Sequence, residues 1–304
     1  MRILGLSKSG VLASAPAQGR AADYLELAKP RLNLLVIATT AAAYCLGARG
    51  AIEMAPLLHT IVGTALVAGG ASAFNMLLER DVDALMARTR NRPLPAGRIG
   101  VVEAGAFAAA ISAMGLVQLA LFVNGLAAGI ALATHLSYVL VYTPLKSRTS
   151  LATVVGAVPG ALPALIGWAA ATNSLSREGW LLFAIVFLWQ MPHFLAIAWL
   201  CRDEYARAGF AVLPVAEPDG RSTARQTVAY AAALFPVSLT PSLAGLSGPM
   251  YFATALVLSA LFLWLSLRFA RRRTRSEARR LFLASILYLP LLCGVLVVDG
   301  LLQL

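Results

Sequence analysis

Charged residues are scarce in this chain. They make up 13% of its 304 residues, whereas hydrophobic residues make up 59%, and the mean hydropathy is +0.76. An ordinary soluble domain is roughly a quarter charged and about half apolar. The shortage excludes a disordered chain, and a soluble core of this length could not hide so much apolar surface. The composition predicts a polytopic membrane protein built of helices.

Cysteine is also scarce, and familiar catalytic fingerprints are missing. The three cysteines, Cys45, Cys201 and Cys293, show neither metal-type spacing nor a disulfide framework, which excludes a disulfide-stapled secreted domain. The chain has no P-loop, no dinucleotide fingerprint and no evident serine or cysteine nucleophile with a base partner. Any chemistry must therefore rest on the few other polar side chains.

Several apolar segments are long enough to cross a bilayer, which takes about 17–25 residues of helix. We expect an all-α membrane protein with about nine transmembrane helices. Residues 27–304 are expected to form a single transmembrane domain, preceded by a basic tail at 1–26. The predicted spans are residues 32–48, 56–78, 101–122, 125–142, 151–172, 179–200, 226–242, 250–269 and 281–298.

Basic residues outnumber acidic ones, 25 against 14, and the net charge is +11. With nine spans, 23 of the 25 lysines and arginines fall on the side of the N-terminus and the even-numbered loops. Because basic residues gather on the cytoplasmic side of membrane proteins, the N-terminus is predicted to be cytoplasmic and the C-terminus periplasmic. The excess charge then faces anionic lipid, and nucleic acid is not expected as a partner.

The first 22 residues carry Arg2, Lys8 and Arg20 and no acidic residue. A mitochondrial transit peptide has such a composition, and so does a short basic tail of a bacterial protein. No strongly amphipathic run is present. This favours the bacterial tail, and a bacterial inner membrane over the mitochondrial inner membrane.

The second cytoplasmic loop, residues 75–99, contains acids that topology does not require. Asn75, Glu79 and Asp83 recur at every fourth position and share one helical face, whereas Asp81 points elsewhere. Oxygen ligands at a membrane–water boundary suit Mg²⁺, which usually bridges protein carboxylates to the phosphates of a substrate. A solvated helix end with Glu–Arg pairs is the competing interpretation.

Other charged residues on the same membrane face could complete a diphosphate site. Asp203 and Glu204 follow the sixth span and form a second acidic pair, which could bind a second Mg²⁺. Nearby cations suit phosphate and could neutralise a departing diphosphate, although the topological preference for positive loops also accounts for them. These cations are Arg88 and Arg92 in the second loop and Lys146 and Arg148 in the fourth.

Few polar residues lie within the predicted spans. The run WQMPHF at 189–194 places a histidine in an apolar wall, where it is a candidate metal ligand, acid–base group or haem contact. The fourth span carries a histidine and two tyrosines on one stripe, and such rings could shield a carbocation. Ordinary helix packing is the alternative for both groups. The residues are His193, Trp189, Phe194, His135, Tyr138 and Tyr142.

An allylic diphosphate is the substrate class that these groups suit. Mg²⁺ and cations at the cytoplasmic face would stabilise the leaving diphosphate, while an apolar tail lies among the helices. The carbocation left behind would be captured by an acceptor in a water-poor cavity.

The acidic loop resembles the UbiA superfamily of intramembrane prenyltransferases, which have nine helices. The pattern NxxxExDxD followed by MxRTxNRPLPxGR carries the likeness, and WQMPHF is similar to the branch that farnesylates protohaem IX. Further matching runs appear in the order of that branch: LAKPRLNLLV (27–36), YTPLKSRT (142–149), GALPALIGWAA (160–170) and DEYARAGFAVLPV (203–215).

This resemblance implies that the farnesyl group of farnesyl diphosphate joins a vinyl group of protohaem IX, with addition of water, to give haem O. Haem O serves terminal oxidases directly or after conversion to haem A, which implies haem A synthase or oxidase assembly as partners. The superfamily usually has Asp where this chain has Glu79, and its spaced second Asp pair is absent. By resemblance, the first metal motif is Asn75, Glu79 and Asp83, the second Asp203 and Glu204, diphosphate lies at Lys146 and Arg88, and haem at His193.

The sequence alone leaves other functions open. A related prenyltransferase could act on a quinone-precursor ring, although WQMPHF and the lack of an arginine deep in the spans speak against it. A transporter would place its charged groups near the bilayer midplane rather than at one face. A haem-delivery assembly factor would not depend on Asp83.

Overall fold

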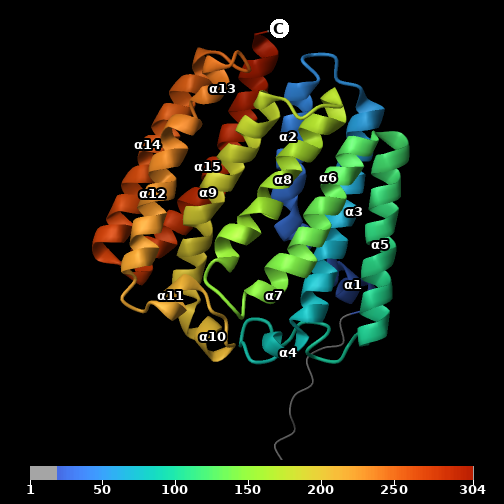
Figure 1. Cartoon of the computed structure of the whole chain (residues 1–304), viewed down its shortest axis with the longest axis vertical. Helices are drawn as coiled ribbons and strands as arrows, with labels where there is room; N and C mark the ends of the chain where they lie inside the picture. The colour runs from blue at the N-terminus through green and yellow to red at the C-terminus, as the bar shows by residue number, and fades with distance from the viewer. Residues whose placement is uncertain (1–18, 304) are drawn as a thin grey trace, which may run out of the picture.

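The fold is known from a computed structural model that describes residues 19–303 (Figure 1), and within that range it contains helices and no strand. The fold class predicted from the composition is confirmed. The long helices are α2 (Pro30–Gly47), α3 (Met54–Leu78), α5 (Val101–Phe122), α6 (Gly125–Leu136), α8 (Ala152–Thr172), α9 (Arg177–Leu200), α12 (Arg221–Val237), α14 (Pro249–Arg272) and α15 (Arg275–Leu302). The short ones are α1 (Arg20–Ala28), α4 (Arg80–Asp83), η1 (Ser137–Tyr142), α7 (Thr143–Leu145), α10 (Arg202–Arg207), α11 (Leu213–Ala216) and α13 (Thr240–Leu243).

Seven helices of the described chain are long and apolar enough to cross a membrane, so the protein is a multi-pass membrane protein. Helices α2 and α12 occupy two further predicted spans but are not among the seven, and the count of nine stays a prediction. Helix α12 ends at Val237, before the predicted limit of 242. Pro241 has no N–H to donate to the carbonyl of Val237, which instead accepts the Thr240 hydroxyl at 2.6 Å.

Residues 1–18 of the predicted tail lie outside the described range. Residues 20–26 belong to α1, which packs on the bundle rather than leaving it. Leu27 is fully buried, Tyr24 packs on Phe107 with ring centroids 4.9 Å apart, and Asp23 pairs with Arg98 at 2.7 Å. Helix α1 therefore holds the start of α2 in place beside α3 and α5.

Small residues allow the helices to approach closely. In the contact between α3 and α5, a Cβ on Gly115 would lie 2.6 Å from the carbonyl oxygen of Gly63. In the contact between α2 and α8, a Cβ on Gly167 would overlap the carbonyl oxygen of Thr40. Lipid surrounds such helices with apolar surface, so close packing and hydrogen bonds must hold them together.

Replacing Gly167 by alanine should loosen the bundle without touching the polar groups described below. The added methyl meets backbone, which cannot move aside as a flexible side chain could. We expect the thermal midpoint of the purified Gly167→Ala protein to fall by about 5 °C. Gly294→Ala is the control, because a Cβ there meets nothing within 4 Å. Equal midpoints for the two variants would contradict the prediction.

Buried hydroxyl groups join the three C-terminal long helices. Tyr288 of α15 shares hydrogen bonds with Ser238 at 2.7 Å and with Ser259 of α14 at 2.8 Å. The hydroxyl of Tyr251 donates to the carbonyl of Ser238 at 2.7 Å. In a medium without water, these bonds satisfy groups that would otherwise oppose burial.

One long helix contains a π turn. The segments α6, η1 and α7 follow one another without a break, and Thr143 donates its hydroxyl to the carbonyl of Tyr138 at 2.9 Å. A π turn carries one more residue per turn than an α-helix and is often found at functional sites. Here it presents Tyr138 and Tyr142 with ring centroids 5.3 Å apart.

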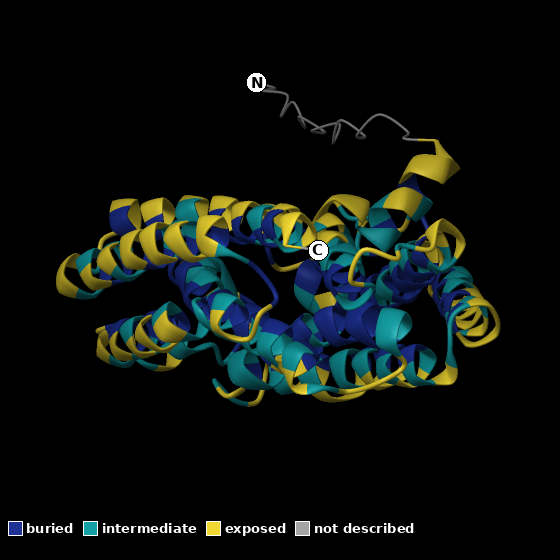
Figure 2. Ribbon diagram, turned by 90° about the horizontal axis from the view of Figure 1, so that it is seen from above, coloured by how far each residue is buried: buried dark blue, intermediate teal, exposed yellow. Residues whose placement is uncertain are grey.

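Most of the short helices lie at one end of the bundle, whereas α13 lies at the other. In Figure 1, α1, α4, α7, α10 and α11 lie at the lower end, and the C-terminus lies at the opposite end. Seen along the helices, exposed residues occupy the rim and buried residues face inward (Figure 2). The end with α4, α7 and α10 contains the polar residues predicted in the second, fourth and sixth loops, whereas His135 and His193 lie within long helices.

Candidate active site

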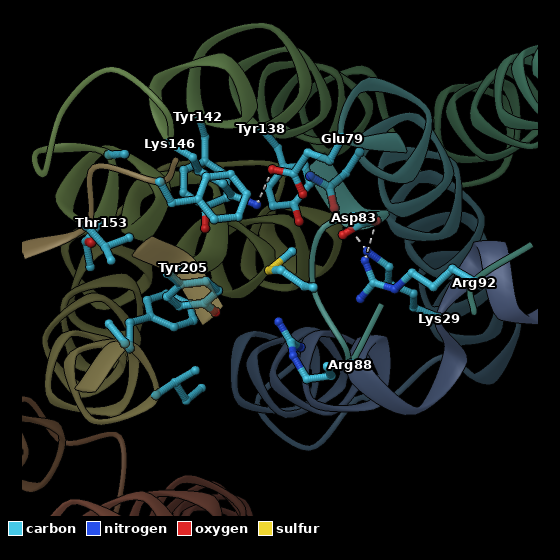
Figure 3. A pocket seen from close by; sticks show the side chains of 18 residues that line it. Lys29, Glu79, Asp83, Arg88, Arg92, Tyr138, Tyr142, Lys146, Thr153 and Tyr205 are labelled. Carbon is cyan, nitrogen blue, oxygen red and sulfur yellow. Dashed lines mark hydrogen bonds and ion pairs between the residues drawn. The ribbon is translucent and has the colours of Figure 1, made fainter. Parts of the chain in front are cut away.

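A cavity of about 220 Å³ opens among the short helices (Figure 3). Sites for drug-sized ligands commonly measure roughly 300–1,000 Å³, so this cavity is matched to the polar head of a larger substrate. Residues from α3, α4, η1, α9 and the loops around α10 line it. The predicted site residues among them are Asn75, Glu79, Asp83, Arg88, Arg92, Tyr138, Tyr142, Lys146 and Phe194.

The end of α3 and the single turn of α4 bring the three predicted metal ligands onto one face. Asn75, Glu79 and Asp83 are all buried and line the cavity. Asp81, between two of them, is 84% exposed in its side chain and pairs with Arg80 at 2.9 Å outside the cavity. The arrangement agrees with the spacing of four residues read from the sequence.

Each of these three polar side chains is held by a different cation. Lys29 donates to Asn75 Oδ1 at 3.0 Å, and Arg92 donates to Asp83 Oδ2 at 2.7 Å. Lys146 Nζ forms an ion pair with Glu79 Oε1 at 2.9 Å. Three cations drawn from three separate segments therefore surround one acidic turn.

The two lysines have different electrostatic surroundings. Burial, together with the neighbouring positive charges of Arg92 and Lys146, lowers the pKa of Lys29 to about 7. Burial also opposes the charged form of Lys146, but Tyr142 and Glu79 beside its ammonium raise its pKa above the ordinary lysine value. Lys146 is thus a permanent cation of the site, while Lys29 lacks comparable stabilisation.

Aromatic and apolar side chains close the inner wall of the cavity. Lys146 Nζ sits 4.6 Å from the ring centroid of Tyr142, a cation–π contact that fixes the ammonium over the ring. Tyr205 of α10 faces the cavity, and burial raises the pKa of its hydroxyl. Phe194 and Ile197 of α9 complete the wall on the membrane side. The cavity therefore combines charged groups with an aromatic and apolar wall.

The oxygen groups of this site fit a magnesium ion. At this end of the described bundle, the buried oxygen Glu204 Oε2 has no hydrogen-bond donor, and Glu79 Oε1 has only the ammonium of Lys146 beside it. No three His, Cys, Asp or Glu side chains in that part of the chain come close enough to hold a metal by themselves. Mg²⁺ usually binds one or two carboxylates and takes its remaining ligands from water and substrate phosphates, which suits this donor set.

The two residues of the second acidic pair, Asp203 and Glu204, differ in exposure and in their neighbours. Asp203 has a side chain 75% exposed and lies near Arg202, with 3.7 Å between Oδ1 and Nε. Glu204 is more buried, and its Oε2 lies 3.9 Å from Nε of Arg88, a cavity residue. Glu204 is therefore the member of the pair that faces the first acidic cluster.

Four other predicted residues lie away from this cavity. Arg148 is exposed, and His135 is buried against Phe74 with ring centroids 5.7 Å apart. His193 points toward α15, where its Nδ1 is 2.7 Å from the hydroxyl of Ser285. Trp189 stacks on His193 and donates to the carbonyl of Ser285 at 3.0 Å.

Gly156 leaves room for the ring of Tyr142, over which the ammonium of Lys146 lies. A Cβ on Gly156 would overlap the ring of Tyr142. Because the ring is stiff, Gly156→Ala should displace both Tyr142 and the ammonium above it, and kcat/KM should fall about tenfold. Gly129→Ala in α6 is the control, since nothing lies within 4 Å of a Cβ there. An unchanged kcat/KM in Gly156→Ala, measured by chromatography of the reaction product, would contradict the role of Gly156 in positioning Tyr142 and Lys146.

Residues 35–289 match the model of the UbiA prenyltransferase family, which is most of the chain. The chain belongs to the UbiA prenyltransferase family. The UbiA match includes every cavity residue except Lys29, which lies before the matched segment. Lys29 is the functional candidate that we did not identify from the sequence. The run LAKPRLNLLV contains it, but a lysine in a cytoplasmic segment is also what topology alone predicts.

Relatives within the UbiA family are similar over nearly their whole length. Protoheme IX farnesyltransferase of Solibacter usitatus (strain Ellin6076) is 49% identical over 286 residues, covering 91% of this chain and 98% of the relative. The protein of the same name from Myxococcus xanthus (strain DK1622) is 45% identical, covering 92% of this chain and 95% of that protein.

Solved structures of the UbiA family share the fold at low sequence identity. A digeranylgeranylglyceryl phosphate synthase superposes with a TM-score of 0.77 at 17% identity, covering 93% of this chain and 99% of that one. A UbiA homolog from Archaeoglobus fulgidus bound to GPP and Mg²⁺ gives a TM-score of 0.65, also at 17% identity, covering 91% and 99%. The fold is therefore that of an intramembrane prenyltransferase.

Proposed function

We propose that this chain transfers the farnesyl group of farnesyl diphosphate to a vinyl group of protohaem IX, giving haem O. The observation that carries the proposal is a buried cavity in which an Asn–Glu–Asp face and four cations meet. Its residues belong to a chain that is 49% identical, over 91% of its length, to a relative named protoheme IX farnesyltransferase.

The reaction begins when the bond between C1 of the farnesyl group and the diphosphate oxygen breaks, and the electron pair leaves with the diphosphate. Lys146 and Arg92 lie where they can neutralise that leaving charge. The vinyl group then forms a carbon–carbon bond to C1, water adds to the resulting cation, and the water releases a proton. The rings of Tyr138 and Tyr142 line the same cavity and are our proposed shield for the positive charge on the farnesyl carbon C1.

Asn75, Glu79, Asp83 and Glu204 are our proposed holders of Mg²⁺. The ion supplies Lewis-acid stabilisation of the diphosphate leaving group when it is bound. A UbiA homolog from Archaeoglobus fulgidus, solved with GPP and Mg²⁺, has the same fold and supports this choice. Metal removal by EDTA should therefore stop product formation, and added Mg²⁺ should restore it.

His193 remains our proposed haem contact. Its Nδ1 is engaged by Ser285, an arrangement that orients the imidazole as partners do for metal-binding histidines. Among the described residues no hydrogen bond reaches Nε2, which is the nitrogen we assign to haem. The position of His193 outside the diphosphate cavity agrees with a separate place for the acceptor.

We further propose that the protein lies in a bacterial inner membrane with the cavity facing the cytoplasm. Helices α4, α7, α10 and α11 lie at the end of the bundle opposite the C-terminus (Figure 1), as a cytoplasmic N-terminus and a periplasmic C-terminus require. Of the 25 basic residues, 23 belong to the predicted cytoplasmic segments, which supports this orientation. Haem A synthase or an oxidase assembly is the expected recipient of the product.

A direct assay tests the reaction. Purified protein in lipid nanodiscs receives protohaem, farnesyl diphosphate and Mg²⁺, and reversed-phase chromatography with mass detection should reveal a more hydrophobic haem carrying farnesyl and one water. A parallel reaction replaces protohaem with 4-hydroxybenzoate. Prenylation of the benzoate without any new haem would overturn the proposal and assign the chain to quinone-precursor chemistry.

A further inference from the structure

Lys29 lines the cavity but has no role in the reaction outlined above. It lies between α1 and α2, and its backbone φ of 49° and ψ of 53° are uncommon for a residue with a Cβ. This turn ends α1 and lets Pro30 begin α2. It also brings the ammonium into the cavity, 3.0 Å from Asn75 Oδ1, and Figure 3 shows Lys29 beside Arg92 and Asp83.

The ammonium of Lys29 lacks an anion of its own. Among the described residues, Asp83 pairs with Arg92 and Glu79 with Lys146, which leaves Lys29 only the amide oxygen of Asn75. A neutral amide compensates a buried positive charge less well than a carboxylate or phosphate does. Without substrate, the positive charge of Lys29 is therefore not neutralised by any carboxylate of the described residues.

The cavity as a whole has the same imbalance. When Lys29 is protonated, four cations and two carboxylates line it, an excess of two positive charges. Glu204, 3.9 Å from Arg88, reduces that excess to one. A divalent cation entering alone would add to this charge, whereas a diphosphate would neutralise it. The electrostatics thus favour entry of the metal together with the diphosphate.

We propose that Lys29 binds the substrate diphosphate, and that in the substrate-free protein it holds Asn75 until the diphosphate arrives. When the ammonium turns to the diphosphate, Asn75 Oδ1 becomes available to the metal. One lysine then couples the two binding events, and by linkage each of them strengthens the other. This inference rests on the proposed function, because it requires a diphosphate in this cavity.

Equilibrium binding to the full-length protein in nanodiscs tests the proposal, with Mn²⁺ as a paramagnetic probe of the metal site and inorganic diphosphate as the anion. In the wild-type protein, Mn²⁺ should bind at least about tenfold more tightly with saturating diphosphate than without it. In Lys29→Met, diphosphate should bind at least about tenfold more weakly. Mn²⁺ alone should bind that variant more tightly than the wild type, because Asn75 is no longer occupied and one positive charge is gone.

Arg31→Met is the matched control. Arg31 is exposed at the start of the same helix, so its replacement removes the same charge outside the cavity. Both affinities should stay within about twofold of wild type, since solvent screens a charge at that position. Lys29→Arg keeps the charge and should retain the coupling. If Lys29→Met is not recovered folded, Lys29→Gln carries the same test.

Unchanged diphosphate affinity in Lys29→Met overturns the proposal, and so does an equal loss in Arg31→Met. A lower thermal midpoint with both affinities unchanged would give Lys29 a packing role instead, which also overturns it. The outcome is separable from that of the proposed function. Haem O formation with normal diphosphate binding by Lys29→Met removes only the lysine's role, whereas coupled binding without any haem product removes only the haem reaction.

Discussion

Exchange of Asp83 for asparagine is expected to lower the rate of farnesylated haem formation at least about 100-fold. The Asp83 side chain is 1% exposed, and its Oδ2 receives a hydrogen bond from Arg92 at 2.7 Å. Asparagine preserves the shape of the side chain but removes its negative charge. The site then loses a carboxylate for Mg²⁺ and leaves the Arg92 guanidinium buried beside an uncharged group. Chromatographic assay of the haem product gives the rate.

Asp81→Asn is the matched control for this experiment. Asp81 lies two residues earlier in the same short helix, and its side chain points outward to Arg80. The same chemical change there should leave the rate within about twofold of wild type, because an exposed ion pair contributes little. If Asp83→Asn, shown to be folded by its thermal midpoint, kept the full rate of product formation, Asp83 would have no role in the reaction.

Replacement of Lys146 by methionine is expected to lower kcat about 100-fold. Methionine keeps most of the length of the lysine side chain and its packing against Tyr142, but it removes the cation next to Glu79. The leaving diphosphate then lacks its most strongly held positive partner.

Arg202→Met separates this effect from a general loss of positive charge. Arg202 also lies over an aromatic ring, 4.5 Å from the centroid of Trp199, and belongs to the same end of the bundle outside the cavity. Its replacement should leave kcat within about twofold. Comparable losses in Lys146→Met and Arg202→Met would mean that the overall field of this membrane face, and not contact with diphosphate, sets the rate.

The helices could be predicted from the sequence because apolar length and basic loops are local signals. Each predicted span coincides with a long helix of the structure, and the largest displacement is that of α12. The grouping of Asn75, Glu79 and Asp83 was predictable for the same reason, since a spacing of four residues needs no tertiary information. Both the extent of a span and the grouping of these three side chains are determined within one helical segment.

Contacts between distant segments were not predictable in this way. Lys29 and Asn75 are 46 positions apart in the chain, and they meet only because α1 folds back on the bundle. The partner of His193 is Ser285, 92 positions away, and the face of α9 that carries His193 differs from the one that carries Phe194. Adjacent residues of a helix point about 100° apart, and only packing decides which of them meets the cavity.

The π turn in the fourth long helix carries one residue more than an α-helical turn does. Deleting one residue between Ser137 and Tyr142 would therefore restore α-helix there and leave the following part, with Lys146, in nearly its present orientation. The same deletion earlier in α6 would remove no extra residue and would rotate the following part by about 100° relative to the preceding part. The π turn should therefore be the part of this helix that best accepts a single-residue gap, a property that recombination between related genes could exploit.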